Sequence, residues 1–132
     1  MNNSILNSAT QLTGRVLMSF IFIMAGISKI GAYAGTQGYM ESMGIPGILL
    51  PLVILLEVGG GLALLLGWQT RIAALLLAGF SVVSAIIFHA NFADQMQSIL
   101  FMKNVAMAGG LLFLVAGTTH VWSIDKIRNA RA

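Results

Sequence analysis

The sequence predicts an all-α integral membrane protein, a single-domain four-helix bundle over residues 1–132 with both termini in the cytoplasm. The chain is 58% hydrophobic and only 8% charged, whereas soluble domains average about a quarter charged residues. Its mean hydropathy is +0.90. The apolar residues gather in four stretches, each with the roughly 20 residues that a helix needs to cross the hydrocarbon core. Lipid is therefore the expected solvent for most of the chain.

The four expected spans are separated by short polar or glycine-rich connections. We place the spans at about residues 12–31, 48–67, 72–89 and 100–121. The segment 67–71 is a tight turn, so spans two and three are expected to be antiparallel neighbours. The connection after the first span is longer and predicts a short interfacial helix at Thr36–Met43, ended by Gly44 and Pro46. Residues 90–99 are expected to form a polar turn.

The basic residues are divided unequally between the two sides of the predicted bundle. Lys29 and Lys103 fall on one side, and the other side collects Arg15, Arg71, Lys126, Arg128 and Arg131. Cytoplasmic loops of membrane proteins carry the excess of lysine and arginine. This rule places the larger group, and both termini, in the cytoplasm.

Each span has a stripe of ionisable and small residues at helical spacing. The stripes contain Arg15, Ser19, Phe22, Gly26 and Lys29; Glu57, Gly60 and Gly61; Arg71, Leu75, Ala78, Val82, Ala85 and His89; and Lys103, Met107 and Gly110. Small residues let helices approach closely in lipid, so we expect all four stripes to face inward around a narrow polar axis. In the alternative interpretation, the cations of these stripes are interfacial anchors. We favour it for Arg15 and Arg71 and leave both interpretations open for Lys29 and Lys103.

Glu57 lies near the middle of the second span, where a charged carboxylate costs on the order of 2.5–3.5 kcal/mol. It must therefore be protonated, paired with a cation, or facing trapped water. Lys29 and Lys103 are its expected partners. Intramembrane ionisable residues are functional candidates by default. The alternative is a buried ion pair that only fixes the packing of the bundle.

The sequence lacks the residues that several kinds of chemistry require. The chain has no cysteine, which excludes disulfides, thiolate metal sites and thiol redox chemistry. Its two histidines, His89 and His120, are expected at opposite ends of the bundle, about 25–30 Å apart. They therefore cannot bind one haem iron. No metal-ligand spacing, nucleotide-binding motif or clustered basic face for nucleic acid is visible. We assign no catalytic residue, no metal and no resident cofactor.

The sequence pattern resembles that of the DoxX family of small bacterial inner-membrane proteins, over about residues 14–126. The family pattern has an arginine and G-x-x-K in the first span, and a glutamate before glycines in the second. An arginine opens the third span, and K-N opens the fourth. These positions correspond to Arg15, Gly26, Lys29, Glu57, Arg71, Lys103 and Asn104. The resemblance implies a four-helix fold in the bacterial inner membrane.

Members of the family are often labelled as quinol oxidase or oxidoreductase subunits, so the resemblance implies a redox-associated role. Without ligands for haem, copper or flavin, we expect no oxidation by this chain alone. A quinone could dock on the polar axis through Glu57, Lys29 or His89. The candidate polar site comprises these three residues with Lys103, Asn104, Arg15 and Arg71.

Three hypotheses about function remain open. The first is a cofactor-less subunit or accessory of a quinone-linked oxidoreductase, which binds a quinone or the partner enzyme. The second is a small proton-coupled transporter or channel in which Glu57 changes protonation. The third is a structural, stress-related membrane protein, for which a homo-oligomer is the expected form.

Overall fold

The computed structural model describes residues 3–117 and 122–131, and it contains no strand within those ranges. The elements, in order, are α1 (Asn3–Gly31), α2 (Tyr33–Ser42), the 3-10 turn η1 (Gly47–Leu49), α3 (Leu50–Ile54), the π-helical segment η2 (Leu55–Gly59), α4 (Gly60–Leu66), α5 (Thr70–Phe88), α6 (Gln95–Ala116) and α7 (Ile124–Arg131). The segments from η1 to α4 form one continuous span. Among the described residues, four helical stretches are long and apolar enough to cross a membrane: 3–31, 47–66, 70–88 and 95–116. The all-helical four-span prediction is confirmed.

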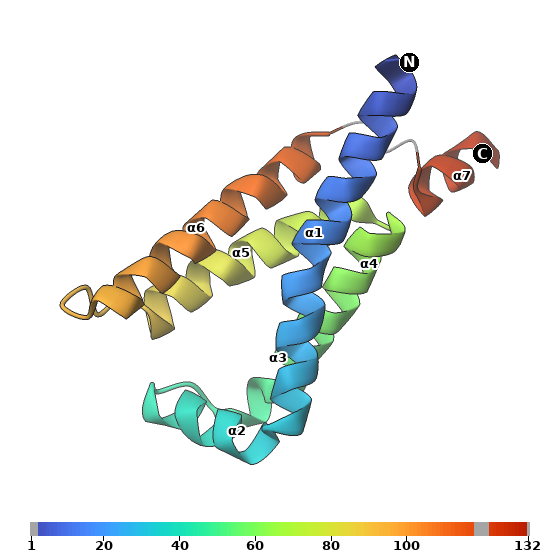
Figure 1. Cartoon of the computed structure of the whole chain (residues 1–132). Coiled ribbons are helices and arrows are strands. Elements are labelled where there is room, and N and C mark those ends of the chain that lie inside the picture. Colours follow the sequence, from blue (N-terminus) through green and yellow to red (C-terminus); the bar gives the residue numbers. More distant parts are fainter. Residues whose placement is uncertain (1–2, 118–121, 132) are drawn as a thin grey trace.

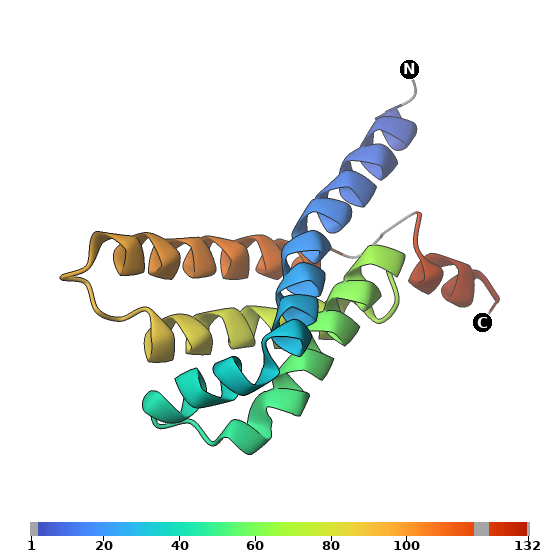
Figure 2. The same cartoon turned by 60° about the horizontal axis from the view of Figure 1, so that its bottom comes forward.

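The spans are arranged as two helical pairs that meet at one end and diverge at the other. Figure 1 shows α1 packed along α3 and α4, and α6 packed along α5. The pairs meet near the α4–α5 turn, and the α5–α6 pair then runs away from α1 (Figures 1 and 2). Spans two and three are therefore antiparallel neighbours only near their turn. The main partner of α5 is α6.

The hydrophobic core lies where the two pairs meet. Phe22 of α1 and Leu64 of α4 pack there with Leu77 of α5 and Leu111 of α6. Each of these four side chains is at most 2% exposed. The outer surface of the spans, in contrast, carries many exposed large apolar side chains, as a surface in contact with lipid requires.

The structure changes the boundaries of the first and fourth spans. α1 begins at Asn3, well before the expected start, and its polar side chains bond within the helix: Thr10 Oγ1 donates to the Leu6 carbonyl at 2.8 Å, and Thr13 Oγ1 donates to the Ala9 carbonyl at 2.7 Å. α6 begins at Gln95 because the Asp94 carboxylate caps it, accepting from the Met96 N–H at 2.9 Å. The expected end of the fourth span, with His120, lies outside the described residues.

Glycine residues allow the turns in the short connections between the helices. The expected helix before the second span is present as α2, and Gly44 follows it in a left-handed conformation with φ of 80°. The α4–α5 turn uses two left-handed residues, Gly67 at φ of 68° and Gln69 at 47°. This conformation suits glycine because it has no Cβ. The tight turn expected at 67–71 is confirmed.

The single polar axis expected from the stripes is wrong for the α5–α6 pair. In α1 the stripe from Arg15 to Gly26 is buried, as predicted. In α5, however, only Ala78 and Ala85 of the predicted stripe are buried. Leu75 is 55% exposed and Arg71 is exposed, and the buried face also contains Leu77 and Ser81. Because this pair diverges from α1, the buried face of α5 is set by α6 and by the point where the pairs meet.

Candidate functional site

Two glycines bring the backbone of α1 against the second span. A Cβ on Gly26 would lie 3.3 Å from both the Glu57 Cβ and the Val58 backbone nitrogen. A Cβ on Gly61 would lie 2.7 Å from the Ile23 side chain and 3.2 Å from a carbonyl of α1. Contacts this short leave no room for a side chain. Because of this close approach, the next turn of α1 lies beside the π-helical segment.

This approach pairs Lys29 with Glu57. The Lys29 Nζ lies 2.8 Å from the Glu57 Oε1, and the two side chains are 30% and 3% exposed. The expected partnership of Lys29 with Glu57 is confirmed. Glu57 is the central residue of the π-helical turn Leu55–Gly59, which the sequence analysis missed. Such turns widen the helix locally and occur often at functional sites.

A cavity of about 480 Å³ lies between the two helical pairs and includes this ion pair in its wall. Its lining is mainly apolar, with Phe22 of α1, Phe80 and Phe88 of α5, and Met107 of α6. Its polar lining residues are Lys29, Thr36, Glu57, Ser81, Ser84, His89 and Asn104. The α2 helix also contributes to the wall, since the Tyr39 ring stacks on Phe88 with centroids 5.4 Å apart. The volume is within the range of small-molecule sites, about 300–1,000 Å³.

Two further candidate residues line the cavity with partners of their own. The Asn104 amide donates to the Ser81 carbonyl at 3.2 Å, which ties α6 to α5. The His89 Nδ1 lies 2.8 Å from the Gln97 Oε1, across the α5–α6 connection. The remaining hydrogen-bonding positions on the imidazole and on the amide stay available to a ligand. The described residues contain no group of three or more histidine, aspartate or glutamate side chains that could hold a metal.

The other three candidates lie away from the cavity. Lys103 is exposed on α6, and the structure gives it no ion pair with Glu57 or any other described residue. Arg71 is exposed and donates from Nε to the Val115 carbonyl at 2.8 Å, which fits an interfacial position. Arg15 is 1% exposed, so its interpretation as an anchor is wrong. The α4–α5 turn and the segment before α7 cover Arg15, whose guanidinium lies beside Gly67 and donates to the Trp122 carbonyl.

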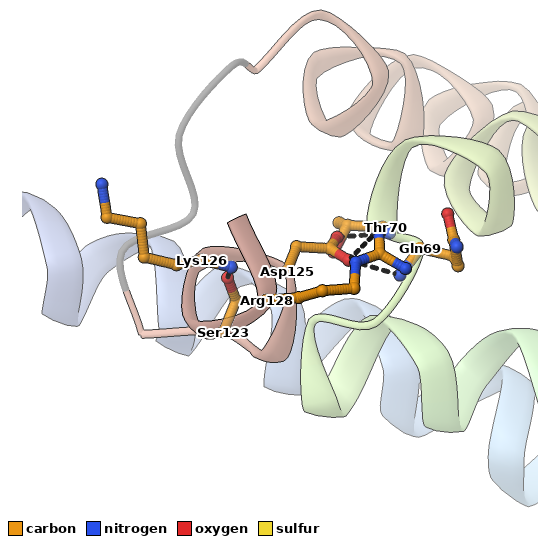
Figure 3. Close-up of polar contacts among 6 residues, drawn as sticks. All are labelled: Gln69, Thr70, Ser123, Asp125, Lys126 and Arg128. Atoms are coloured by element: carbon orange, nitrogen blue, oxygen red, sulfur yellow. Dashed lines mark hydrogen bonds and ion pairs between the residues drawn. The ribbon is translucent and has the colours of Figure 1, made fainter. Parts of the chain in front are cut away.

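Arg15 belongs to a second polar cluster, at the end of the molecule where the α4–α5 turn lies. Figure 3 shows the centre of this cluster, where the Asp125 carboxylate of α7 accepts from the N–H groups of Gln69 and Thr70 at 2.8 and 2.9 Å. The Asp125 N–H in turn donates to the Gly67 carbonyl at 2.9 Å. The first residues of α5 are thus capped by a side chain from a distant segment.

The environment of Asp125 favours its charged form. Burial alone would raise the pKa of this carboxyl. The hydrogen bonds from the Thr70 and Gln69 backbone and the charge of Arg128, 3.5 Å away, instead hold the pKa below its ordinary value of 3.8. Asp125 therefore remains an anion under ordinary conditions and keeps α7 attached to the turn.

Sequence reasoning missed three residues that shape these sites: Ser81, Tyr39 and Asp125. Ser81 is the central polar residue on the buried face of α5, and its four-residue spacing from both Leu77 and Ala85 was a readable signal. The position of Tyr39 depends on how α2 folds back toward α5 (Figure 2), and no local sequence pattern predicts this arrangement. Asp125 acts on residues more than 50 positions away, so no local pattern marks it.

The fold and the cavity define a class: a small four-span membrane protein with a paired lysine and glutamate in the wall of an apolar cavity. The profile of the DoxX family matches residues 10–90, and the chain belongs to this family. Inner membrane protein YqjF of Escherichia coli is 52% identical over 120 residues, covering 91% of this chain and 92% of YqjF. No solved structure matches the chain significantly.

Two further relatives are more distant. Inner membrane protein YphA of E. coli is 32% identical over 123 residues, covering 87% of each chain. A Bacillus subtilis protein named "Putative oxidoreductase CatD" is 33% identical over 73 residues, covering 55% of this chain and 54% of CatD. These relationships support the family and the membrane-embedded fold.

Proposed function

We propose that this protein is a cofactor-less inner-membrane subunit or accessory of a quinone-linked oxidoreductase, and that it holds the quinone ring in the cavity between its two helical pairs. The observation that carries the proposal is the Lys29–Glu57 pair in the wall of an otherwise apolar cavity. A ring with polar substituents on an apolar body suits such a site, because apolar walls bury the ring and a few polar groups orient it.

The hydrogen-bonding capacity of the site suits both redox forms of a quinone. The ammonium of Lys29 has three N–H donors, and the contact with Glu57 leaves others for a quinone carbonyl. The Glu57 carboxylate accepts only, which suits the hydroxyl of a quinol. Asn104 and His89, from the other helical pair, provide polar groups for the far side of the ring. The site therefore binds and orients its ligand, while electron transfer falls to a partner that contains the redox centre.

The comparisons support the location and the redox connection. YqjF and YphA are named inner membrane proteins, and we assign this chain to the same membrane. CatD is named a putative oxidoreductase, and this name supports the proposed redox connection. The excess of cations near the α4–α5 turn and α7 supports an orientation with both termini in the cytoplasm.

The test is binding of quinone to the purified protein in detergent. We expect quinone extracted from the native membrane to co-purify with the protein. A short-chain ubiquinone analogue should raise the midpoint of thermal unfolding. Glu57→Gln should abolish both effects. Lys103→Gln is the matched control, since Lys103 is an exposed cation of α6 that does not line the cavity, and it should leave both effects intact.

Other outcomes would redirect the assignment. Absence of quinone in the purified protein together with no stabilisation by the analogue would refute the proposal. Proton flux into liposomes that requires Glu57 would instead support a proton-coupled transporter. If neither activity is found, the ion pair has a structural role only.

A further inference from the structure

The α7 helix is fixed at the boundary of the membrane by its contacts with the α4–α5 turn. This turn joins two spans, so it lies where the hydrocarbon core ends. Asp125 at the start of α7 makes hydrogen bonds to the backbone of Gly67, Gln69 and Thr70 within the turn. The Trp122 carbonyl, just before α7, accepts from the buried Arg15 of α1. The start of α7 is therefore held at this depth by two sets of contacts.

The exposed side chains of α7 and of the segment before it include both basic and large apolar ones. Lys126 is exposed and points away from Asp125, and the Arg128 side chain is 52% exposed (Figure 3). Trp122 is 47% exposed and Ile127 is 56% exposed. Ile127 follows Asp125 by two residues, about 200° around the helix, so it faces away from the turn.

We infer that α7 is a lipid-binding helix, whose exposed apolar residues enter the head-group region while Lys126 and Arg128 bind the phosphates of anionic phospholipids. Helices of this composition lie in the membrane interface and are attracted to anionic lipids. A second tryptophan, Trp68 in the turn itself, is 50% exposed at the same level, as expected of an aromatic belt. The inference does not depend on any ligand in the cavity.

Charge complementarity favours a lipid surface over a protein partner. The segment from Trp122 to Arg131 contains three cations and one anion. That anion, Asp125, already accepts a hydrogen bond from the backbone of the turn. The Arg128–Asp125 contact at 3.5 Å is an exposed pair and holds Arg128 only weakly. Lys126 and Arg128 are thus free to bind phosphates without disturbing the attachment of α7 to the turn.

The test uses Trp122 as the reporter. Since the chain has two tryptophans, the background variant Trp68→Phe leaves Trp122 as the only indole. The full-length protein is reconstituted in equimolar phosphatidylcholine and phosphatidylglycerol, with dibrominated chains in one lipid at a time, so that the composition stays constant. We expect Trp122 fluorescence to be quenched by both lipids. Brominated phosphatidylglycerol should quench about twice as strongly.

Paired variants identify the charges responsible. The double variant Lys126→Gln with Arg128→Gln should bring the quenching ratio to one. Arg71→Gln removes a cation at the same end of the molecule but outside α7, and it should leave the ratio unchanged. Absence of quenching by either lipid would overturn the inference, since α7 would then face water. Equal quenching by the two lipids in the background variant, or an unchanged ratio in the double variant, would also overturn it.

Discussion

Replacement of Lys29 by methionine would leave the Glu57 carboxylate without its cation. Breaking a fully buried ion pair costs roughly 3–5 kcal/mol, because the remaining charge is uncompensated. Here Glu57 is 3% exposed but Lys29 is 30% exposed, so part of the pair is already screened. We therefore expect Lys29→Met to lower the free energy of unfolding by about 2 kcal/mol.

The reverse replacement should be milder. In Glu57→Gln the buried residue is neutral, and the partly exposed Lys29 can extend its ammonium toward the head groups. We expect a loss below about 1 kcal/mol for this variant. The double variant Lys29→Met with Glu57→Gln should recover part of the free energy of unfolding that Lys29→Met loses, because the carboxylate that lacked a partner is no longer present. This coupling between the two sites is the signature of the pair.

The measurement is equilibrium unfolding in mixed micelles with increasing dodecyl sulfate, followed by helical circular dichroism. Lys103→Met is the matched control, and it should change the free energy of unfolding by less than about 0.5 kcal/mol because Lys103 is an exposed surface position. Equal losses for Lys29→Met and Lys103→Met would refute the reasoning. So would a larger loss for Glu57→Gln than for Lys29→Met.

Three further predictions concern packing and the second polar cluster. Gly26→Ala should lower the free energy of unfolding by about 1–3 kcal/mol, since its Cβ has no room, whereas Gly14→Ala, with open space around it, should be neutral or stabilising; unfolding midpoints of the two variants decide this. Gly67→Ala should cost more than about 2 kcal/mol, because the position has φ of 68° and a Cβ would meet Arg15; normal yield and stability would contradict it. Asp125→Asn should cost about 1 kcal/mol above pH 4. Because the folded-state pKa of Asp125 is lowered, its contribution is complete above 3.8 and is lost as the pH falls through the folded value, so an acid titration of stability should show a shallower fall in the variant.

The number of spans and the Lys29–Glu57 pair could be predicted because local rules decide them. Apolar stretches of about 20 residues predict spans in lipid. A carboxylate at mid-span requires a partner, and few cations are within reach. The glycine after α2 similarly predicts the end of that helix, since its left-handed conformation suits glycine.

The relative placement of the helices could not be predicted in this way. A helical stripe shows which residues share a face, but it does not show which neighbour covers that face. The α5–α6 pair diverges from α1 (Figure 1). Lys103 is therefore exposed, although it belongs to a stripe with small residues as Lys29 does. The buried Arg15 donates to the carbonyl of Trp122, more than 100 positions away, and such a contact leaves no local pattern.

The most direct test of the quinone site is photolabelling of the purified protein with an azido-quinone, followed by identification of the labelled residues by mass spectrometry. The account predicts labels on cavity residues of both helical pairs, such as Ile21, Phe80 and Met107. An excess of unlabelled quinone should suppress these labels, and Glu57→Gln should remove them. Labels confined to lipid-facing residues such as Phe113, or cavity labels unaffected by Glu57→Gln, would contradict the account.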